Sequence, residues 1–553
     1  MHVTVRDVAV GYPGRPVLRG VAFTAAAGTR LGLVGENGTG KTTLLRVLAG
    51  DLAPASGEVR VVGRVRTVAQ ELAVGGGLTV GALVEESLEA ARAATAELTA
   101  ATDAVDRLGP HAGPAAAAEA SARLAGALAH AERLRVWDAD RRADEALTRF
   151  GAPRDVQREL ASLSVGERYR VRLACRIAER PDVLLLDEPT NHLDEAGIEY
   201  LTEQLRVWPG VVVIVTHDRR LLDDVMTAIL DLDPSVDGRP TLHGESSYAA
   251  YRFARTQALR RWRARYAAEQ KRALALAKRL DDAYEGLSDE WRPPKGSQKH
   301  RRATRARLHV KAADRLIGRL EAAAVEVPAP PLTLAFPDLP AMPRAADTAH
   351  PLLEVRGVQV PGRLELPGVR IDLPACGRLL VTGPNGSGKS TLLAVLAGLL
   401  LPARGLRTVA PGVRFGLVAQ DDGVRPAEGT ADEDGRRTGF EAYAAHALAL
   451  LDQGLLDPEQ LVPVASLGLL SDDDLERPLA ELSVGQRRRF DLACSLLAAP
   501  HVLLLDEPTN HLSVALVDEL TQALLTTSAA VVVATHDRAL RRDLAEWPEL
   551  TLG

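Results

Sequence analysis

A glycine-rich loop that joins an apolar strand to a helix occurs twice in this chain, and this repeat constrains the fold more than any other feature. The first copy, GENGTGKTT, lies between LGLV and TTLLRVLAG, and the second copy is GPNGSGKST. Both match GxxxxGK[ST], in which backbone N–H groups surround a phosphate while the lysine bridges its oxygens. The loop residues are Gly35, Glu36, Asn37, Gly38, Thr39, Gly40, Lys41, Thr42 and Thr43, and Gly383, Pro384, Asn385, Gly386, Ser387, Gly388, Lys389, Ser390 and Thr391. The sequence therefore predicts two α/β domains that each bind a nucleotide phosphate.

Each loop is followed further along the chain by an apolar strand that ends in two carboxylates. VLLLDEPTNHLD provides Asp187 and Glu188, and VLLLDEPTNHL provides Asp506 and Glu507. In-line phosphoryl transfer needs one carboxylate near the metal ion and a second one that orients the attacking water. We therefore expect Mg²⁺ beside Asp187 and Asp506, and we expect Glu188 and Glu507 to be catalytic.

Three further motifs occur in the same order in both halves of the chain. A glutamine ends a strand-like stretch after each loop, an LSVG motif opens a helix, and a histidine follows an apolar strand. The helix start can bind an anion, and the histidine can hydrogen-bond a γ-phosphate or its water. These residues are Gln70, Ser164, Gly166, Glu167 and His217 in the first half, and Gln420, Ser483, Gly485, Gln486 and His536 in the second. The expected metal ligands are Thr42, Gln70, Asp187, Ser390, Gln420 and Asp506.

This order of loop, glutamine, LSVG motif, carboxylate pair and histidine resembles that of the ATP-binding-cassette ATPases. The resemblance implies ATP and Mg²⁺ as cofactors, with adenine stacked on Tyr12. It also implies that residues 164–167 bind the ATP held by the opposite cassette, and that residues 191–194 lie at the dimer seam. Each complete site would then join the loop of one cassette to the LSVG motif of the other.

Three positions depart from the pattern of that family. Val165 stands where a second glycine is usual, and Ser513 stands where the first copy has Asp194. The stretch around residues 360–362 offers no aromatic residue to match Tyr12. Because Glu188 and its counterpart in the second copy are both present, we expect two hydrolytic sites with unequal properties.

The spacing of the motifs indicates an insertion in the first copy. From Lys41 to Ser164 the chain advances 123 positions, against 94 from Lys389 to Ser483, whereas the distance from the LSVG serine to the histidine is 53 in both copies. The extra residues are rich in Ala, Glu and Arg, with apolar residues three and four apart and a GPHAGP break. They predict a helical hairpin, an arm at about residues 85–150.

The stretch between the two copies has no counterpart elsewhere in the chain. Residues 251–320 contain 20 Lys or Arg and 7 Asp or Glu, a local net charge of +13 in a chain of net charge −6. The pattern predicts helices at 247–284 and 303–324 with a tip at 288–302. A charged hairpin that merely tethers two domains is the simpler interpretation, but basic residues interleaved with Trp262, Tyr266, Tyr284 and Trp291 favour RNA contact.

Tandem cassettes, an arm in the first and a basic hairpin between them resemble the ABC-F family of ribosome-associated ATPases. In that family the hairpin enters the ribosomal exit site beside the peptidyl-tRNA, and members act as translation factors or confer antibiotic resistance. The resemblance implies that residues 246–330 contact rRNA and peptidyl-tRNA, and the modest arm and sizeable tip resemble resistance proteins of actinobacteria. The expected organisation is an ATPase domain at 1–245, a linker at 246–330, a connector at 331–349 and a second ATPase domain at 350–553.

Composition narrows the class of protein. The chain has no run of about 18 to 20 uncharged apolar residues and no signal-peptide core, and its three cysteines form no CxxC pair, so we expect a cytoplasmic protein. The tandem-cassette resemblance implies a monomer in which the two cassettes form an intramolecular dimer. An exporter ATPase subunit, a housekeeping translation factor of the same family, a DNA-repair ATPase and a non-enzymatic scaffold remain alternatives. An exporter subunit would need a separate membrane protein and would leave the basic hairpin without a role.

Overall fold

The computed structural model covers the whole chain apart from a set of short segments and the middle of the linker. It describes all residues except 13–14, 70–76, 109–112, 245–246, 291–326, 341–350, 385, 420–435, 457, 459–460 and 511. Within the part described, the chain divides into two compact units. The first contains residues 1–233, 242–248 and 332–553, and the second contains residues 234–241 and 249–331.

The first cassette begins with an antiparallel sheet of order β2-β1-β4. Its strands are β1 (His2–Tyr12), β2 (Arg15–Ala26) and β4 (Ser56–Val62). Side chains along β1 point alternately to the two faces of the sheet, so Val3 and Val5 are buried on one face. A register shift between Val5 and Val8 brings Val8 and Val10 to the same buried face. This face packs on helix α1 (Lys41–Ala49), so the sheet and the phosphate-binding helix share one core.

A six-stranded sheet of order β5-β6-β7-β3-β8-β9 forms the centre of the first cassette. Its strands are β3 (Arg30–Val34), β5 (Val65–Val68), β6 (Val183–Asp187), β7 (Val211–Val215), β8 (Ala228–Asp231) and β9 (Thr241–Gly244). The pairs from β5 through β8 are parallel, and β6 and β7 are buried along their whole length. Because parallel strands end at one edge, the loop after β3 meets the residues that follow β6 and β7.

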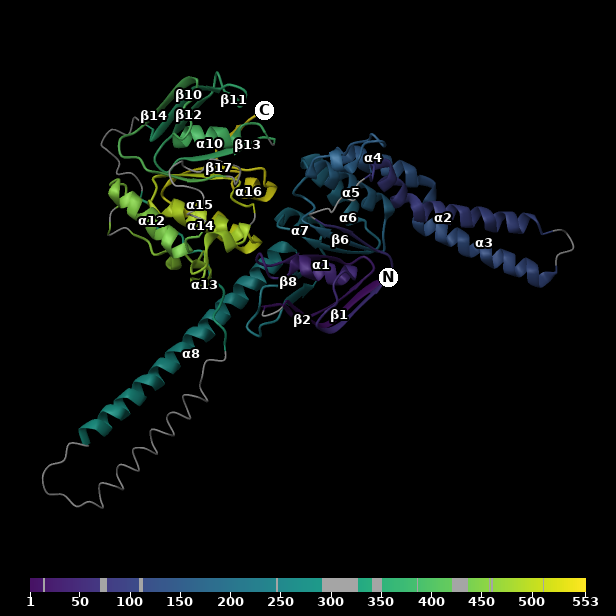
Figure 1. Ribbon diagram of the computed structural model, residues 1–553, viewed down its shortest axis with the longest axis horizontal. Coiled ribbons are helices and arrows are strands. Elements are labelled where there is room, and N and C mark those ends of the chain that lie inside the picture. The colour runs from purple at the N-terminus through teal and green to yellow at the C-terminus, as the bar shows by residue number, and fades with distance from the viewer. Residues whose placement is uncertain are drawn as a thin grey trace, which may run out of the picture. The chain divides into compact units, whose positions relative to one another are not determined.

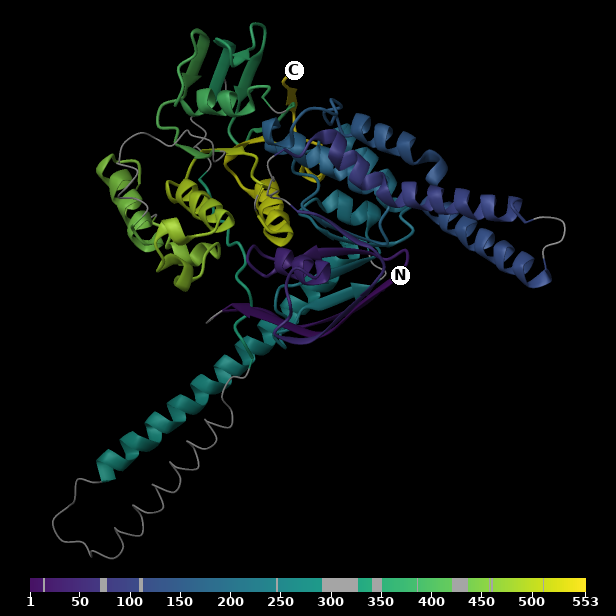
Figure 2. The same ribbon diagram turned by 45° about the vertical axis from the view of Figure 1, so that its right-hand side comes forward.

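Helices complete this cassette. They are α2 (Val80–Asp106), α3 (Pro114–Leu134), α4 (Ala139–Arg149), α5 (Val165–Glu179), α6 (Glu195–Arg206) and α7 (Arg219–Val225), with 3-10 turns η1 (Val136–Asp138) and η2 (Leu160–Ser162). Helices α2 and α3 lie side by side as the predicted arm (Figures 1 and 2). A small apolar cluster of Leu88, Ala139, Ala143 and Ala178 fixes the base of the arm.

Within its described residues, the second cassette repeats this plan and shows no arm. Its antiparallel strands are β10 (Leu353–Val360), β11 (Leu364–Glu365), β12 (Arg370–Leu373) and β14 (Arg404–Val409). Its parallel sheet, of order β15-β16-β17-β13-β18, contains β13 (Arg378–Thr382), β15 (Phe415–Val418), β16 (Val502–Asp506), β17 (Ala530–Ala534) and β18 (Glu549–Thr551). The structure therefore confirms the prediction of two α/β cassettes.

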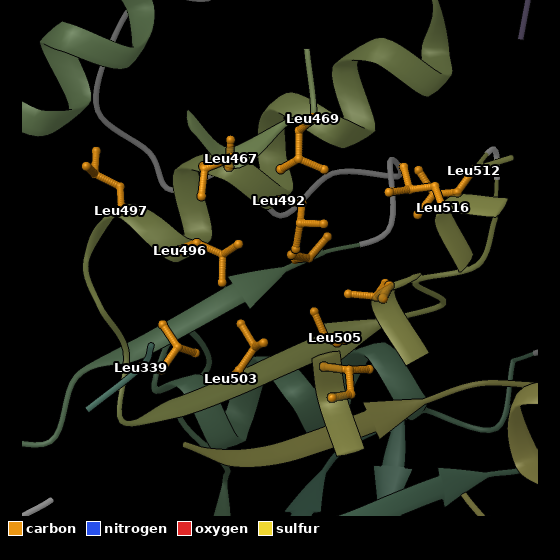
Figure 3. Close-up of a cluster of buried hydrophobic side chains, with 14 of the residues drawn as sticks. Leu339, Leu467, Leu469, Leu492, Leu496, Leu497, Leu503, Leu505, Leu512 and Leu516 are labelled. Atoms are coloured by element: carbon orange, nitrogen blue, oxygen red, sulfur yellow. The ribbon is translucent and has the colours of Figure 1, made fainter. Parts of the chain in front are cut away.

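Leucines dominate the core of the second cassette, as Figure 3 shows for Leu492, Leu496, Leu503 and Leu505. The helices are α10 (Lys389–Ala397), α12 (Gly439–Asp452), α13 (Asp472–Leu475), α14 (Val484–Leu497), α15 (Val514–Thr526) and α16 (Arg538–Asp543), with η4 (Val464–Leu467) and η5 (Leu479–Glu481). Part of the expected connector also belongs to this core, because Leu339 is buried in it.

The second unit contains most of helix α8 (Tyr248–Glu290). The helix ends at Glu290 rather than at Tyr284 as predicted, so it includes the first residues of the expected tip. The returning helix and residues 291–302 of the tip lie outside the described residues. At the base of the hairpin the buried Trp262 donates its ring N–H to the carbonyl of Pro328 at 2.9 Å, which links the two ends of this unit.

None of the described helices combines the length and the apolar character that a membrane crossing requires.

Candidate nucleotide-binding sites

The first phosphate-binding loop has the backbone that its glycines predict. Gly35, Gly38 and Gly40 have φ values of 141°, 90° and 96°, which side chains rarely adopt. A Cβ at Gly40 would also lie 2.7 Å from a methyl group of Leu18. The Lys41 ammonium is buried and donates to the carbonyls of Gly35 (2.7 Å) and Glu36 (3.0 Å), so it lies in the loop where a phosphate would bind.

The second loop reproduces this geometry. Gly383, Gly386 and Gly388 have φ values of 149°, 84° and 96°. The Lys389 ammonium donates to the carbonyls of Gly383 (2.9 Å) and Pro384 (3.2 Å), the same two positions as in the first loop. The two loops are therefore equivalent in their phosphate-binding groups, while Asn385 lies outside the described residues.

The residues expected to hold Mg²⁺ fit a hard cation. The Thr42 hydroxyl donates to Asp187 Oδ2 at 2.8 Å, which places a hydroxyl and a carboxylate oxygen side by side. In the second cassette Asp506 Oδ1 is buried and accepts no hydrogen bond from the described residues. Burial raises the pKa of both aspartates, so a cation would relieve the cost of their ionisation. Gln70 and Gln420 lie outside the described residues.

The buried Glu188 and the half-buried His217 form a pair where β6 and β7 end. Glu188 has the left-handed φ of 48°, and its backbone N–H donates to the carbonyl of Val215 at 2.9 Å. Its carboxylate accepts the backbone N–H of His217 at 3.3 Å, and Oε1 lies 3.2 Å from His217 Nε2. Burial raises the pKa of Glu188 to about 8, so in the nucleotide-free protein this carboxyl carries a proton at neutral pH.

Glu507 has more partners than Glu188. It also has a left-handed φ, 46°, and it accepts the Thr535 hydroxyl and the His536 backbone N–H, both at 3.2 Å. The His536 ring approaches through Nδ1 at 2.8 Å, whereas the first site uses Nε2, and Lys389 lies 3.7 Å away. The hydrogen bond to Glu507 raises the pKa of His536. The two sites therefore differ in the environment of their glutamates, while the expectation of unequal hydrolysis stays a prediction.

The LSVG motifs are helix starts in both cassettes. Ser164 caps α5 by accepting the Glu167 N–H at 3.2 Å, and the Glu167 carboxylate accepts the Ser164 N–H at 2.8 Å. Ser483 and Gln486 form the same capping box on α14. Val165, at the position where the family has glycine, projects outward with 55% of its surface exposed and does not distort the start of the helix.

A cavity of about 410 Å³ in the first unit contains much of this machinery. It brings together residues of the first loop, the first carboxylate pair, residues that follow the second pair, and both histidines. Its lining includes Asn37, Lys41, Thr42, Asp187, Glu188, Asn191, His217, Asn510 and His536.

Asp194, expected at the seam, caps α6 by accepting the Gly197 N–H at 2.8 Å, and Ser513 does the same for α15 at 3.3 Å from the Leu516 N–H. Serine thus retains the capping role of the aspartate.

Arg219 is a residue that the sequence did not single out. It directly follows the His217–Asp218 segment, is 4% exposed, and binds Asp518 at 2.7 Å and Asp543 at 3.0 Å. The second oxygen of Asp518 accepts the hydroxyl of Tyr248, the first residue of α8, at 2.7 Å. One carboxylate therefore joins the segment after the histidine to the start of the hairpin helix. The spacing of charged residues carries no signal for such a pairing.

The side chain of Tyr12 lies outside the described part, so adenine stacking remains a prediction. In the second cassette β10 ends at Val360 and Gly362 has a φ of 72°, and no aromatic side chain is available there.

Two parallel-sheet domains, each with a phosphate loop, a carboxylate pair, a histidine and a capped LSVG helix, define a tandem ATP-binding-cassette protein. Residues 18–191 and 366–510 match the family described as "ABC transporter", and full-length relatives place the chain in the F branch. The chain is a member of the ABC-F family.

The relatives cover nearly the whole chain. The tylosin resistance ATP-binding protein TlrC of Streptomyces fradiae is 38% identical over 98% of this chain and 95% of that protein. The energy-dependent translational throttle protein EttA of Mycobacterium tuberculosis is 31% identical over 97% of this chain and 88% of that protein. Among solved structures, an archaeal ribosome recycling factor, aABCE1, aligns with a TM-score of 0.51 and 17% identity over 97% of this chain and 86% of that one, which shows the shared fold.

Proposed function

We propose that this protein is a Mg²⁺-dependent ATPase that binds the ribosome and protects it from an antibiotic. The observation that carries the proposal is the segment of charge +13 placed between two cassettes with complete catalytic sets. A soluble polyanion such as ribosomal RNA is the partner that this charge fits. Relatives named for tylosin resistance and for translational throttling support the same partner.

The geometry supports a division of roles in ATP hydrolysis. Lys41 and the loop N–H groups would bind the phosphates, and Thr42 and Asp187 would hold Mg²⁺, which neutralises charge on the phosphates when it is bound. Glu188 would orient the attacking water, because Lys41 and a bound Mg²⁺ would lower the pKa of this carboxyl toward the ionised form. His217 would hydrogen-bond the γ-phosphate. The second cassette offers the corresponding residues Lys389, Ser390, Asp506, Glu507 and His536.

The test replaces Glu188 and Glu507 together by glutamine. We expect the double variant to bind ATP, to lose at least about a hundredfold in turnover, and to remain on ribosomes after sedimentation with ATP. The double variant Glu199→Gln/Glu546→Gln, which makes the same change at two exposed glutamates, serves as the matched control. Release of the double variant from ribosomes at the wild-type rate would contradict the proposed cycle.

Deletion of residues 288–302 separates resistance from hydrolysis. We expect the ATPase activity without ribosomes to remain, and growth of a sensitive host on tylosin and related drugs to be lost. Loss of both properties would show that the tip is needed for folding. Growth without the drug distinguishes the alternative of a housekeeping translation factor, because only that role would slow growth in the absence of drug.

A further inference from the structure

A second basic site lies in the first cassette, at the base of the arm. A cavity of about 250 Å³ opens there, several times the ~30 Å³ that one water occupies in the liquid. Its walls come from the turn between α3 and α4, from α4 itself, from the C-terminal end of α5, and from α6. We call this space the arm-base cavity, and its charged lining consists of Arg135, Asp138, Arg141, Arg142, Glu145 and Arg180.

The cavity has an excess of positive charge. Three guanidinium groups share the carboxylate of Asp138, from Arg135 at 3.0 Å, from Arg141 at 3.3 Å, and from Arg142. Glu145 is the second carboxylate and lies 3.4 Å from Arg141. Four arginines and two carboxylates leave a net charge of +2 in a partly desolvated space, which favours binding of an anion.

Not all of these arginines are available to a ligand. Arg142 donates to the carbonyls of Leu134, Arg135 and Ala178, so it ties together the C-terminal ends of α3 and α5. Arg180 differs, because its guanidinium makes no hydrogen bond or ion pair with any residue that the structure describes, although it lines the cavity. Burial and the charges of Arg135 and Arg142 lower the pKa of Arg180, so an anion at this place would relieve the repulsion.

Neutral donors complete the cavity. The Tyr200 ring is fixed by an edge contact with Phe150 at 5.1 Å, and its side chain lines the cavity beside Gln204. Burial raises the pKa of Tyr200 to about 12, so its hydroxyl keeps its proton and can donate to an anion. Planar guanidinium groups with a hydroxyl and an amide are a donor set suited to a phosphate.

An exposed aromatic ring stands beside the cavity. Trp137 lies in η1 between the lining residues Arg135 and Asp138, and 64% of its surface is exposed. The other tryptophans that the structure describes, Trp208, Trp262 and Trp547, are 3%, 5% and 8% exposed. An indole left in solvent next to a phosphate-sized basic cavity is the arrangement that stacks an unpaired base while its backbone is held by cations.

We propose that the arm-base cavity and Trp137 form an RNA site distinct from the hairpin, which holds a backbone phosphate between Arg135 and Arg180 and stacks an unpaired base on Trp137. The inference rests on the proposed ribosome association and adds a second contact to it. Free pyrophosphate could bind the same arginines but has no base to stack on Trp137. Binding that depends on Trp137 therefore distinguishes an RNA phosphate from free pyrophosphate.

The experiment uses the full chain and a single-stranded oligouridylate that carries 4-thiouridine. After irradiation we expect mass spectrometry to find crosslinked peptides from residues 134–141 in addition to any from α8. The variant Arg135→Gln/Arg180→Gln should reduce the crosslinks at 134–141 at least about tenfold, and should lower the salt slope of binding by about 0.7 for the one phosphate contact that is lost. Arg123→Gln, an exposed arginine of α3 with no ion pair among the described residues, is the control for charge alone.

Trp137 provides the second variant. Trp137→Ala should weaken the same crosslinks about tenfold, and Trp137→Phe should retain most of them because the ring is kept. Crosslinks that are unchanged in the arginine variant, or confined to α8, would overturn the proposal. If pyrophosphate protects Arg180 from modification equally in wild type and Trp137→Ala while the RNA crosslink at 134–141 is missing, the cavity binds only small phosphates and the RNA site is refuted. Ribosome sedimentation of the ATP-locked double variant, measured in parallel, tests the proposed function separately.

Discussion

Replacing Glu188 by glutamine should stabilise the nucleotide-free first cassette at neutral and alkaline pH, although it removes the carboxylate that we assign to hydrolysis. Burial raises the pKa of Glu188 from 4.5 to about 8. Between about pH 4.5 and pH 8 the folded chain therefore holds a proton on Glu188 that the unfolded chain has already released. Since the folded state binds more protons in this window, its stability falls as the pH rises through it. Glutamine has no proton to lose, so the variant escapes this decline.

The size of the gain follows from the same values. At pH 7.5 the unfolded carboxyl lies about three pH units above its pKa, which corresponds to about 4 kcal/mol at 1.36 kcal/mol per unit. One loss reduces this figure by about 1 kcal/mol, because the hydrogen bond from the His217 N–H to the side chain weakens. A net gain of about 3 kcal/mol remains, which should raise the Tm of the first cassette by about 6–12 °C.

Calorimetry of the nucleotide-free protein at pH 5 and pH 7.5 measures this effect. Glu188→Gln should raise the transition at pH 7.5 and change it little at pH 5. Glu507→Gln is the matched control, because its carboxylate already pairs with Lys389 and His536 and accepts the Thr535 hydroxyl, so the variant should lose stability. A lower Tm for Glu188→Gln at pH 7.5, or the same rise at both pH values, would refute the reasoning.

Three further variants test contacts away from the reacting groups. Ser164→Ala removes the cap of α5 and should cost about 1 kcal/mol in urea unfolding, with a lower ATPase rate; an unchanged rate would remove the LSVG serine from the site. Arg219→Met leaves the half-buried carboxylates of Asp518 and Asp543 without their guanidinium and should cost about 2 kcal/mol, whereas the double variant with Asp518→Asn should cost less than the sum of the two. Trp262→Phe removes the hydrogen bond at the base of the hairpin and should cost about 1 kcal/mol, seen as about fivefold faster hydrogen exchange in the first part of α8; slower or equal exchange would contradict the contact.

The parts of the fold that the sequence predicts are those encoded by local pattern. Glycines at Gly35 and Gly40 require a turn that other residues rarely adopt, and the apolar run before Asp187 can only be a buried strand. Capping by Ser164 also follows from the motif, because serine three residues before glutamate is a local signal. These features therefore appear in the structure at the expected positions.

The remaining features depend on residues far apart in the chain. The bond between Arg219 and Asp518 spans 299 positions, and no periodicity relates them. Helix α8 ends at Glu290, later than the predicted end at Tyr284. The polar residues after Tyr284 are compatible with both helix and turn, so the sequence does not locate the end. The arm-base cavity likewise arises only when the ends of α3 and α5 meet, since a charge count along the sequence does not show which arginines lack a carboxylate.

The left-handed backbone at Glu188 and Glu507 has a consequence for how such a chain changes over time. A residue with a β-carbon at φ values of 48° and 46° stores about 1–3 kcal/mol, and at Glu188 the buried acid adds to that burden. Glycine or asparagine would relax the backbone at either place. At Glu188, where burial also opposes the acid, such a replacement should raise thermostability, whereas at Glu507 it would also remove the contacts with Lys389 and His536. A lineage relieved of selection for the Glu188 carboxylate would therefore drift away from glutamate at that position first.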